Sequence, residues 1–246
     1  MIYFISDVHL GLFHREKDLP REQLLLEFLR AISRDCKTLY MVGDIFDYWF
    51  EYKTVVPKYF YRTLAALRWM RDSGIEIEYI MGNHDFGHHD FFEKELDIKI
   101  YTGDIEREIN GKKFYLSHGD GKSYKDTGYK ILKKILRNKT AQWMFTKLHP
   151  DFGIGLASHS SKSSRAYTDN KDFNEAEGDG MRDFAIHKIE EGFDYVIMGH
   201  RHKLIEERIS KGFYINLGDW FSEPCCGRFD GKKFELVKVK DVIAKK

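Results

Sequence analysis

Cysteine and long apolar stretches are both scarce in this chain. Its 246 residues include only 3 cysteines, and two of these, Cys225 and Cys226, are adjacent. Adjacent cysteines bond to each other only in unusual backbone geometry, and an odd count gives no disulfide framework, so we expect a reducing compartment. No stretch reaches the roughly 18 apolar residues of a membrane span, and the amino terminus does not resemble a secretory signal. These absences predict a cytoplasmic, non-spanning protein.

An excess of charge of one sign is absent as well. The formal net charge is +1, although 32% of the residues are charged and 42% are hydrophobic. Such a chain has enough apolar material for one sizeable core, so a single domain is expected over residues 1–246. The balanced charge argues neither for nor against a nucleic-acid partner.

Apolar runs that alternate with helical patterns fill the first part of the chain. Strands are expected over 1–6, 38–42 and 75–81. Pro20 and Pro57 are expected to open the helices between them, and Gly74 to end the second helix. This βα alternation is typical of parallel strands covered by helices.

Hairpins take over in the later part of the chain. Asn110-Gly111 lies between two strand-like runs and is a strong signal for a two-residue hairpin turn. A helix over 183–191 and further strands over 194–198, 204–209 and 213–217 follow. The whole pattern predicts an α/β (α+β) fold, a four-layer αββα sandwich of two mixed sheets.

The strand pattern stops between about residues 123 and 173. From Lys125 to Pro150 there are seven Lys or Arg residues against one acid, and apolar residues recur there at helical spacing. We therefore expect a helical lid over a ligand that is both anionic and apolar. The alternative is an amphipathic helix packed on the core, with a solvated basic face.

Polar side chains follow five strand-like runs, where each run ends. They occur in Asp7-x-His9, Gly43-Asp44, Gly82-Asn83-His84-Asp85, Ser117-His118 and Gly199-His200-x-His202. Each motif alone is weak, but chance does not readily place five of them in this order at strand ends. Clefts of open α/β sheets lie at such ends, so these side chains are expected to form one cluster.

The chemistry of this cluster points to metal ions. Carboxylate, amide oxygen and imidazole together suit Mn, Fe or Zn in sites of five or six ligands. Asp44 has two oxygens and is our candidate for a bridging ligand between two ions. Such a pair lowers the pKa of a shared water and neutralises charge on a phosphoryl oxygen. Asp47, three residues further on, could be an extra ligand, but we expect it to hydrogen-bond the backbone of its loop, which is the commoner role of such an acid.

The ordered set of motifs resembles the calcineurin-like metallophosphoesterase family, over nearly the whole chain. The resemblance implies two divalent ions, most readily Mn²⁺, with Fe²⁺ or Zn²⁺ as alternatives. One ion would take Asp7, His9, Asp44 and His202, and the other would take Asp44, Asn83, His118 and His200. It also implies that His84 hydrogen-bonds the phosphate or the leaving oxygen and that Asp85 holds His84 in place.

Within that family the chain is most similar to the UDP-2,3-diacylglucosamine hydrolases of lipid A synthesis. The shared features are Gly43-Asp-Ile-Phe-Asp-Tyr-Trp49, His118-Gly-Asp120 and the basic, aliphatic insertion. The resemblance implies cleavage of the pyrophosphate to UMP and an acylated sugar phosphate at the inner-membrane surface, with no nucleic-acid partner. The substrate contacts carried over by position are Asp126, Tyr129, Ser161 and Arg165.

One residue departs from that subgroup, and two other functions stay open. Well-known proteobacterial members carry Arg directly after the Asn of the third motif, where this chain has His84. Because histidine cannot clamp phosphate bidentately, another phosphodiester or a nucleotide is an alternative substrate. A non-catalytic module that binds through the lysine-rich segment is the alternative from another class, and it predicts steep salt dependence.

Overall fold

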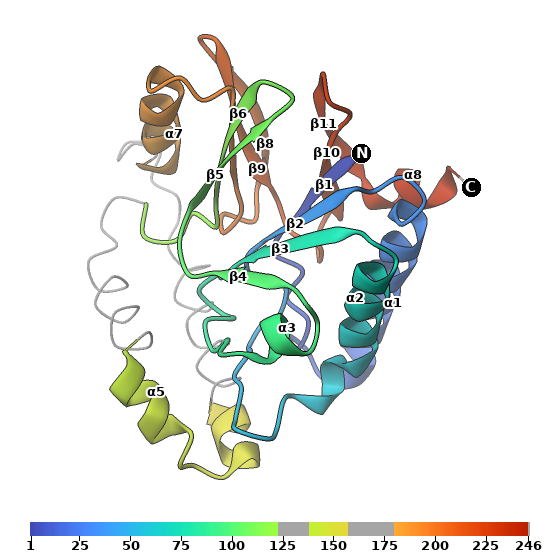
Figure 1. Ribbon diagram of the computed structural model, residues 1–246, viewed down its shortest axis with the longest axis vertical. Helices are drawn as coiled ribbons and strands as arrows, with labels where there is room; N and C mark the ends of the chain where they lie inside the picture. The colour runs from blue at the N-terminus through green and yellow to red at the C-terminus, as the bar shows by residue number, and fades with distance from the viewer. Residues whose placement is uncertain (123–137, 157–179, 246) are drawn as a thin grey trace.

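Two β-sheets form the centre of the protein, with helices on their outer faces (Figure 1). The computed structural model describes residues 1–122, 138–156 and 180–245. Along the chain, βα units of the first half build most of one sheet, and hairpins and one further βα unit build the other.

The larger sheet has six strands in the order β11-β10-β1-β2-β3-β4. Its strands are β1 (Ile2–Ile5), β2 (Thr38–Val42), β3 (Glu76–Ile80), β4 (Lys99–Tyr101), β10 (Cys225–Phe229) and β11 (Phe234–Lys238). Strands β1 to β4 are parallel, whereas β10 runs antiparallel to β1 and to β11. The carboxyl ends of β1, β2 and β3 therefore meet at one edge.

The second sheet has five strands in the order β5-β6-β7-β9-β8. Its strands are β5 (Ile105–Ile109), β6 (Lys112–Ser117), β7 (Tyr195–Met198), β8 (Leu204–Ile209) and β9 (Gly212–Leu217). Strands β6, β7 and β9 are parallel, and the two outer strands are antiparallel to their neighbours. Asn110 and Gly111 both have positive φ in the β5–β6 turn, as the hairpin signal predicts.

Helices cover the two outer faces. Those of the larger sheet's side are α1 (Arg15–Ile32), α2 (Tyr61–Asp72), α3 (Phe91–Lys94) and α8 (Val239–Ala244), and a 3-10 turn over Lys58–Phe60 precedes α2. On the other side, α7 (Gly180–Glu190) packs against the second sheet (Figure 1). A smaller helical piece contains α5 (Lys139–Phe145) and a helix over 150–156.

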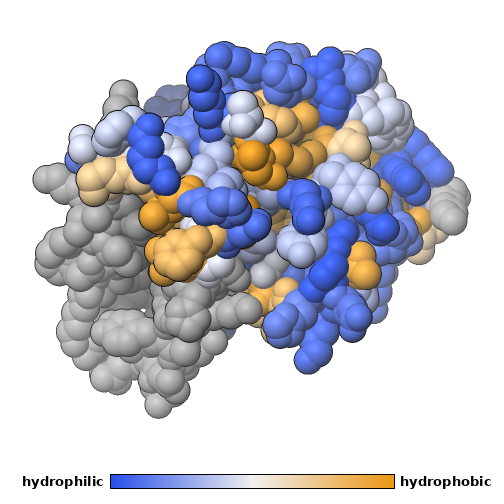
Figure 2. Space-filling view, turned by 90° about the horizontal axis from the view of Figure 1, so that it is seen from below, coloured by the Kyte–Doolittle hydropathy of each residue, from blue (hydrophilic) through white to orange (hydrophobic). Residues whose placement is uncertain are grey.

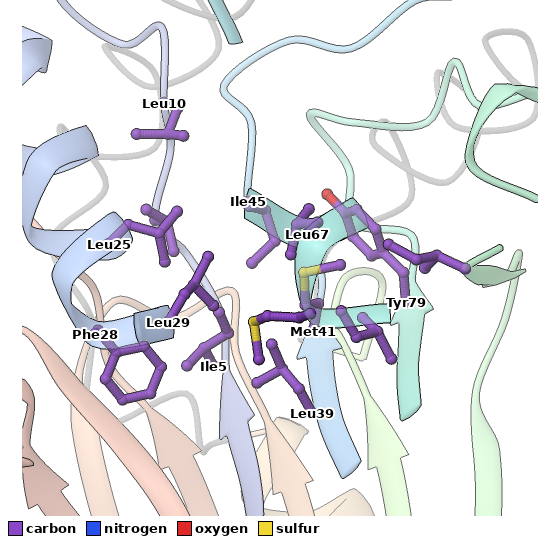
Figure 3. Close-up of a cluster of buried hydrophobic side chains, with 14 of the residues drawn as sticks. Ile5, Leu10, Leu25, Phe28, Leu29, Leu39, Met41, Ile45, Leu67 and Tyr79 are labelled. Carbon is purple, nitrogen blue, oxygen red and sulfur yellow. The ribbon is translucent and has the colours of Figure 1, made fainter. Parts of the chain in front are cut away.

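Alternation along the buried strands explains the four layers. In β2, Leu39 and Met41 face α1 and α2, whereas Tyr40 and Val42 face the second sheet. Figure 3 shows this helix-facing cluster, in which Leu39 and Met41 lie among side chains of α1 and α2. A continuous apolar strand is thus buried on both faces, as expected of a central parallel strand. The αββα sandwich predicted from the sequence is confirmed.

One local prediction is wrong, and two short elements were not predicted. Helix α1 begins at Arg15 and contains Pro20, so Pro20 does not open it. The carboxylate of Asp18 accepts hydrogen bonds from the backbone of Gly11 and Phe13, which anchors this earlier first turn against the preceding loop. Strand β4 and helix α8 were not predicted, because segments of 3 and 6 residues carry too short a pattern.

None of the helices within 1–122, 138–156 and 180–245 is long and apolar enough to cross a bilayer.

Candidate metal centre

The loops after β1, β2, β3, β6 and β7 bring the seven predicted ligand residues together. The first two loops continue to pair beyond their strands, because the backbone N–H groups of Asp7 and His9 donate to the carbonyls of Gly43 and Asp44 at 3.1 and 3.0 Å. The side chains on these two loops are therefore held in fixed positions relative to each other.

Five residues of this cluster have left-handed backbone conformations, which non-glycine residues seldom adopt. The φ angles are +51° at Asp7 and His9, +53° at Asp44, +68° at His200 and +54° at His202. Each such residue costs on the order of 1 kcal/mol or more, and such strain gathers where function requires it. The backbone thus aims these five side chains at one point at the expense of local stability.

Glycine is needed at two positions that precede ligand residues. A Cβ atom on Gly82 would overlap the carboxylate of Asp44, and one on Gly199 would overlap the carboxylate of Asp7. The loops after β3 and β7 therefore carry glycine at these positions, because the buried carboxylates approach the backbone too closely for any side chain.

Asp7, His9 and His202 form the first group of potential ligands. The Nε2 atoms of His9 and His202 are 3.1 Å apart, and they lie 3.5 and 3.2 Å from Oδ1 of Asp7. Asp7 is also fixed by the backbone N–H of His200, which donates to its carboxylate at 3.0 Å. Two imidazole nitrogens and a carboxylate oxygen thus surround one common point.

Asp44, His118 and His200 form the second group, in which one ligand atom of each lies within 4.8 Å of the others. Nε2 of His118 is 3.2 Å from Oδ2 of Asp44 and 3.0 Å from Oδ1 of Asn83. Asp44 also reaches the first group, because its Oδ2 is 3.8 Å from Nε2 of His9. Asp44 is therefore placed between the two groups.

The hydrogen bonds of the imidazoles show that this donor set fits metal ions. Nδ1 of His118 lies 3.0 Å from the carbonyl oxygen of Val42, which can only accept, so Nδ1 carries the proton. In the neutral ring, Nε2 then points a lone pair at Asp44 and Asn83. Nδ1 of His9 likewise faces Oδ1 of Asp47 at 3.2 Å, which leaves Nε2 toward the first group. Such outer partners are typical of metal-binding histidines.

Burial and close charges shift the pKa values of the cluster. Burial alone would raise the pKa of Asp7 and Asp44, but the neighbouring imidazoles hold both below their usual range. Burial also works against protonation of His118, yet Asp44 raises the pKa of His118 to about 10. Burial and the charge of His118 lower the pKa of His200 to about 4. Metal binding at the second group must therefore release a proton from His118. The metal affinity of this group falls as the pH falls.

His84 and Asp85 lie on the loop after β3, but they point to different surroundings. Asp85 is fully buried, and its carboxylate accepts from the Tyr79 hydroxyl and from the backbone of Ile45 and Gly82. Two acids lie near the His84 ring: Oδ1 of Asp47 is 4.0 Å from Nδ1, and a carboxylate oxygen of Asp44 is within 4.8 Å of a ring nitrogen. The support of His84 by Asp85 stays a prediction, and Asp47 is a further carboxylate near the His84 ring.

Asp47 is the functional candidate that the sequence analysis missed. It was expected only to hydrogen-bond its own loop, yet its carboxylate faces the imidazole of His9 and lies near that of His84. The available signal was the spacing of two acids three residues apart after one strand, Asp44 and Asp47.

A buried glutamate ties the loop after β2 to the loop after β3. Glu51 is 3% exposed, and its carboxylate accepts from Nε1 of Trp49 at 3.0 Å and from the backbone amides of residues 89–91 at 2.8–3.1 Å. Burial works against the charge, but His88 and these donors lower the pKa of Glu51 to about 2. The charged carboxylate therefore stabilises the fold.

We expect Glu51→Gln to lower the free energy of unfolding at pH 7 by up to about 3 kcal/mol, because a lowered folded-state pKa adds stability above the unfolded-state pKa. The contribution is lost as pH falls from about 4.5 to about 2, so wild type and variant converge there. Urea denaturation at pH 7, 4 and 3 measures this. Glu207→Gln removes a partly exposed ion pair with Arg182 and is the control, with an effect below about 1 kcal/mol. A difference between wild type and Glu51→Gln that is independent of pH would contradict this account.

The four predicted substrate contacts are not placed by the structure. Asp126, Tyr129, Ser161 and Arg165 lie outside the described residues, as does most of the predicted lid. Within its described portion, Phe145 of α5 packs on Phe50 with ring centroids 4.5 Å apart. Phe50 follows the metal-centre loop directly, so this part of the insertion lies against that loop.

Known proteins resemble this chain in sequence. The sequence model of a family described as calcineurin-like phosphoesterase matches residues 1–204. A Porphyromonas gingivalis protein named UDP-2,3-diacylglucosamine hydrolase is 33% identical, over 98% of both chains. A protein of the same name from Pseudomonas fluorescens is 29% identical, over 96% of this chain and 94% of the relative. Among solved structures, the E. coli phosphoesterase Yfce has a TM-score of 0.48 at 13% identity, over 98% of this chain and 93% of Yfce.

Proposed function

Since the chain belongs to the calcineurin-like phosphoesterase family, we propose that it is the two-metal hydrolase that cleaves the pyrophosphate of UDP-2,3-diacylglucosamine. The products are UMP and 2,3-diacylglucosamine 1-phosphate, as in lipid A biosynthesis. The observation that carries the proposal is the meeting of Asp7, His9, Asp44, His118, His200 and His202 in groups of ligand atoms within 4.8 Å. The names of relatives aligned along nearly the whole chain support this substrate.

In this proposal, the two groups hold one divalent ion each, with Asp44 shared and Asn83 in the second group. Mn²⁺ is the proposed ion, because hard oxygen donors and imidazoles occur together and no thiolate joins them in the described residues. The ions would supply Lewis acidity that polarises a phosphoryl oxygen and acidifies a water.

The remaining polar side chains of the site contact the substrate or hold the loop after β3 in place. His84 lies with His9 and Asp44 in a group whose ligand atoms are within 4.8 Å of one another, so it is placed to donate a hydrogen bond to a phosphoryl or leaving oxygen. The carboxylate of Asp47, 4.0 Å from Nδ1 of His84, is placed to orient that imidazole. Asp85 holds the loop itself through Tyr79 and the backbone of Ile45 and Gly82.

The described part of the insertion offers apolar surface for a lipid substrate. Trp143 and Met144 on α5 are 60% and 59% exposed, and Phe152 on the next helix is 64% exposed. Figure 2, seen from the end of the molecule where α5 lies in Figure 1, shows hydrophobic side chains exposed among charged ones. Together with the lysines of the segment, this surface supports a lid over acyl chains at residues 123–173 and contact with the cytoplasmic face of the inner membrane.

The decisive experiment supplies the purified, Mn²⁺-loaded protein with UDP-2,3-diacylglucosamine in detergent and, separately, with bis(p-nitrophenyl) phosphate. We expect UMP release from the lipid substrate with a kcat/KM at least about a hundredfold above that for the aryl diester, because remote binding energy raises the rate. Metal-stripped protein is the control and should release no UMP until metal is restored.

Turnover of the aryl diester alone would overturn the lipid assignment and leave a phosphoesterase for another phosphodiester or a nucleotide. Absence of turnover with both substrates at several divalent metals would overturn the proposed chemistry.

A further inference from the structure

Phe221, on the loop between β9 and β10, exposes an aromatic ring directly beside the metal centre. Its ring centroid is 5.3 Å from that of His202, with the planes at 90°, and 6.1 Å from that of His9. The side chain is nevertheless 41% exposed. An aromatic ring that is partly exposed next to two candidate metal ligands can offer its face to a ligand bound at the centre.

The loop backbone that carries this ring is anchored by the two residues that precede Phe221. The neighbouring Trp220 is 2% exposed, packs edge-on against Phe28 at 5.5 Å, and donates its backbone N–H to the carbonyl of Asp7 at 3.1 Å. Asp219, which is 4% exposed, accepts from the backbone of Phe221 and Ser222 at 2.9 and 2.6 Å. A ring fixed in this way loses little further freedom when a ligand packs on it.

The surroundings of Phe221 favour a planar ligand with polar edges over an acyl chain. Ser222 and Glu223, which follow it, are exposed, and Asp219 lies under the loop. The exposed apolar residues of α5 belong to another region, since α5 lies well away from the β9 and β10 connection in Figure 1. Among the described residues, a flat ring followed by polar side chains matches a nucleobase, which stacks through its face and hydrogen-bonds through its edge.

We propose that Phe221 is a specificity-determining residue whose exposed ring stacks on the nucleobase of the substrate. This inference rests on the proposed function, in which a nucleotide phosphate occupies the centre lined by His9 and His202. The base of a nucleotide is separated from its phosphate by one ribose, so the ring that borders these two imidazoles lies within its reach. The uridine half of the substrate is thus directed toward the β9–β10 loop, and the acylated sugar toward the insertion.

Calorimetric titration of the Mn²⁺-loaded protein with UMP and with ribose 5-phosphate tests this, because the two ligands share the phosphate and differ in the base. Wild type should bind UMP about tenfold more tightly than ribose 5-phosphate, the range expected for one stacked base. Phe221→Leu keeps an apolar side chain but removes the flat ring, and it should bring the two affinities within about twofold. Phe221→Tyr keeps the ring and should retain the preference.

Trp69→Leu is the matched control, since Trp69 is an aromatic residue 46% exposed on α2, and it should behave as wild type. Equal affinity of wild type for the two ligands would overturn the inference. So would an equal loss of both ligands in Phe221→Leu, because that result indicates disturbance of the metal centre. Failure of UDP-2,3-diacylglucosamine to react would instead overturn the proposed function, and the preference for UMP would remain measurable.

Discussion

Asp44→Asn should reduce turnover of UDP-2,3-diacylglucosamine by at least about a thousandfold, since one shared carboxylate positions both ions and electrostatic stabilisation commonly contributes that much. Asparagine tolerates the left-handed backbone that Asp44 adopts at φ +53°, and its amide oxygen can still accept from the backbone of His84. The amide nitrogen would then replace the oxygen that faces His118 at 3.2 Å. The variant therefore removes charge and bridging capacity while it preserves the local fold.

Metal analysis separates this loss from unfolding. We expect Asp44→Asn to retain one ion or fewer per chain after gel filtration, with a thermal midpoint close to that of the metal-free wild type. Asp97→Asn is the matched control, because Asp97 has the same left-handed backbone at φ +56° and an exposed ion pair with Arg71. Two bound ions, or more than a tenth of wild-type turnover, in Asp44→Asn would contradict the shared-carboxylate assignment.

His84→Ala should lower kcat by about a hundred- to a thousandfold and change KM far less, because a group that donates to developing charge acts mainly in the transition state. Asp47→Asn should cause a smaller loss in the same direction, since its carboxylate lies 4.0 Å from Nδ1 of His84 and 3.2 Å from Nδ1 of His9. Rates with each variant, measured at saturating substrate and fixed Mn²⁺, give both parameters.

His84→Arg addresses the departure from the proteobacterial relatives. Arginine supplies permanent charge and two parallel donors, so this variant should recover part of the rate that His84→Ala loses and should lack any pH dependence that comes from the imidazole. Wild-type kcat in His84→Ala would show that this side chain has no part in the reaction. Loss of bound metal in His84→Ala would assign it a ligand role instead.

The fold followed from the sequence to a large extent, and the reason lies in burial. Strands such as β2 are apolar on both faces because they lie between helices and a second sheet, so they appear as continuous hydrophobic runs. The hairpin at Asn110-Gly111 could also be predicted, because positive φ at two successive residues strongly restricts which residues can occupy the turn. The first residue of α1 could not be predicted, because hydrogen bonds from the backbone of Gly11 and Phe13 to Asp18 fix the start of this helix.

The sequence by itself determined which residues could form the metal centre. The seven candidates stand at the ends of apolar runs, and carboxyl ends of parallel strands meet at one edge, so the pattern predicted which residues gather at the edge of each sheet. The packing of the two sheets brings these edges together. Only the tertiary structure decided what supports them and what surrounds them. Asp47 beside His9, Glu51 across two loops and Phe221 beside His202 are contacts between loops. No periodicity records such contacts, because loop paths depend on the packing of the whole domain.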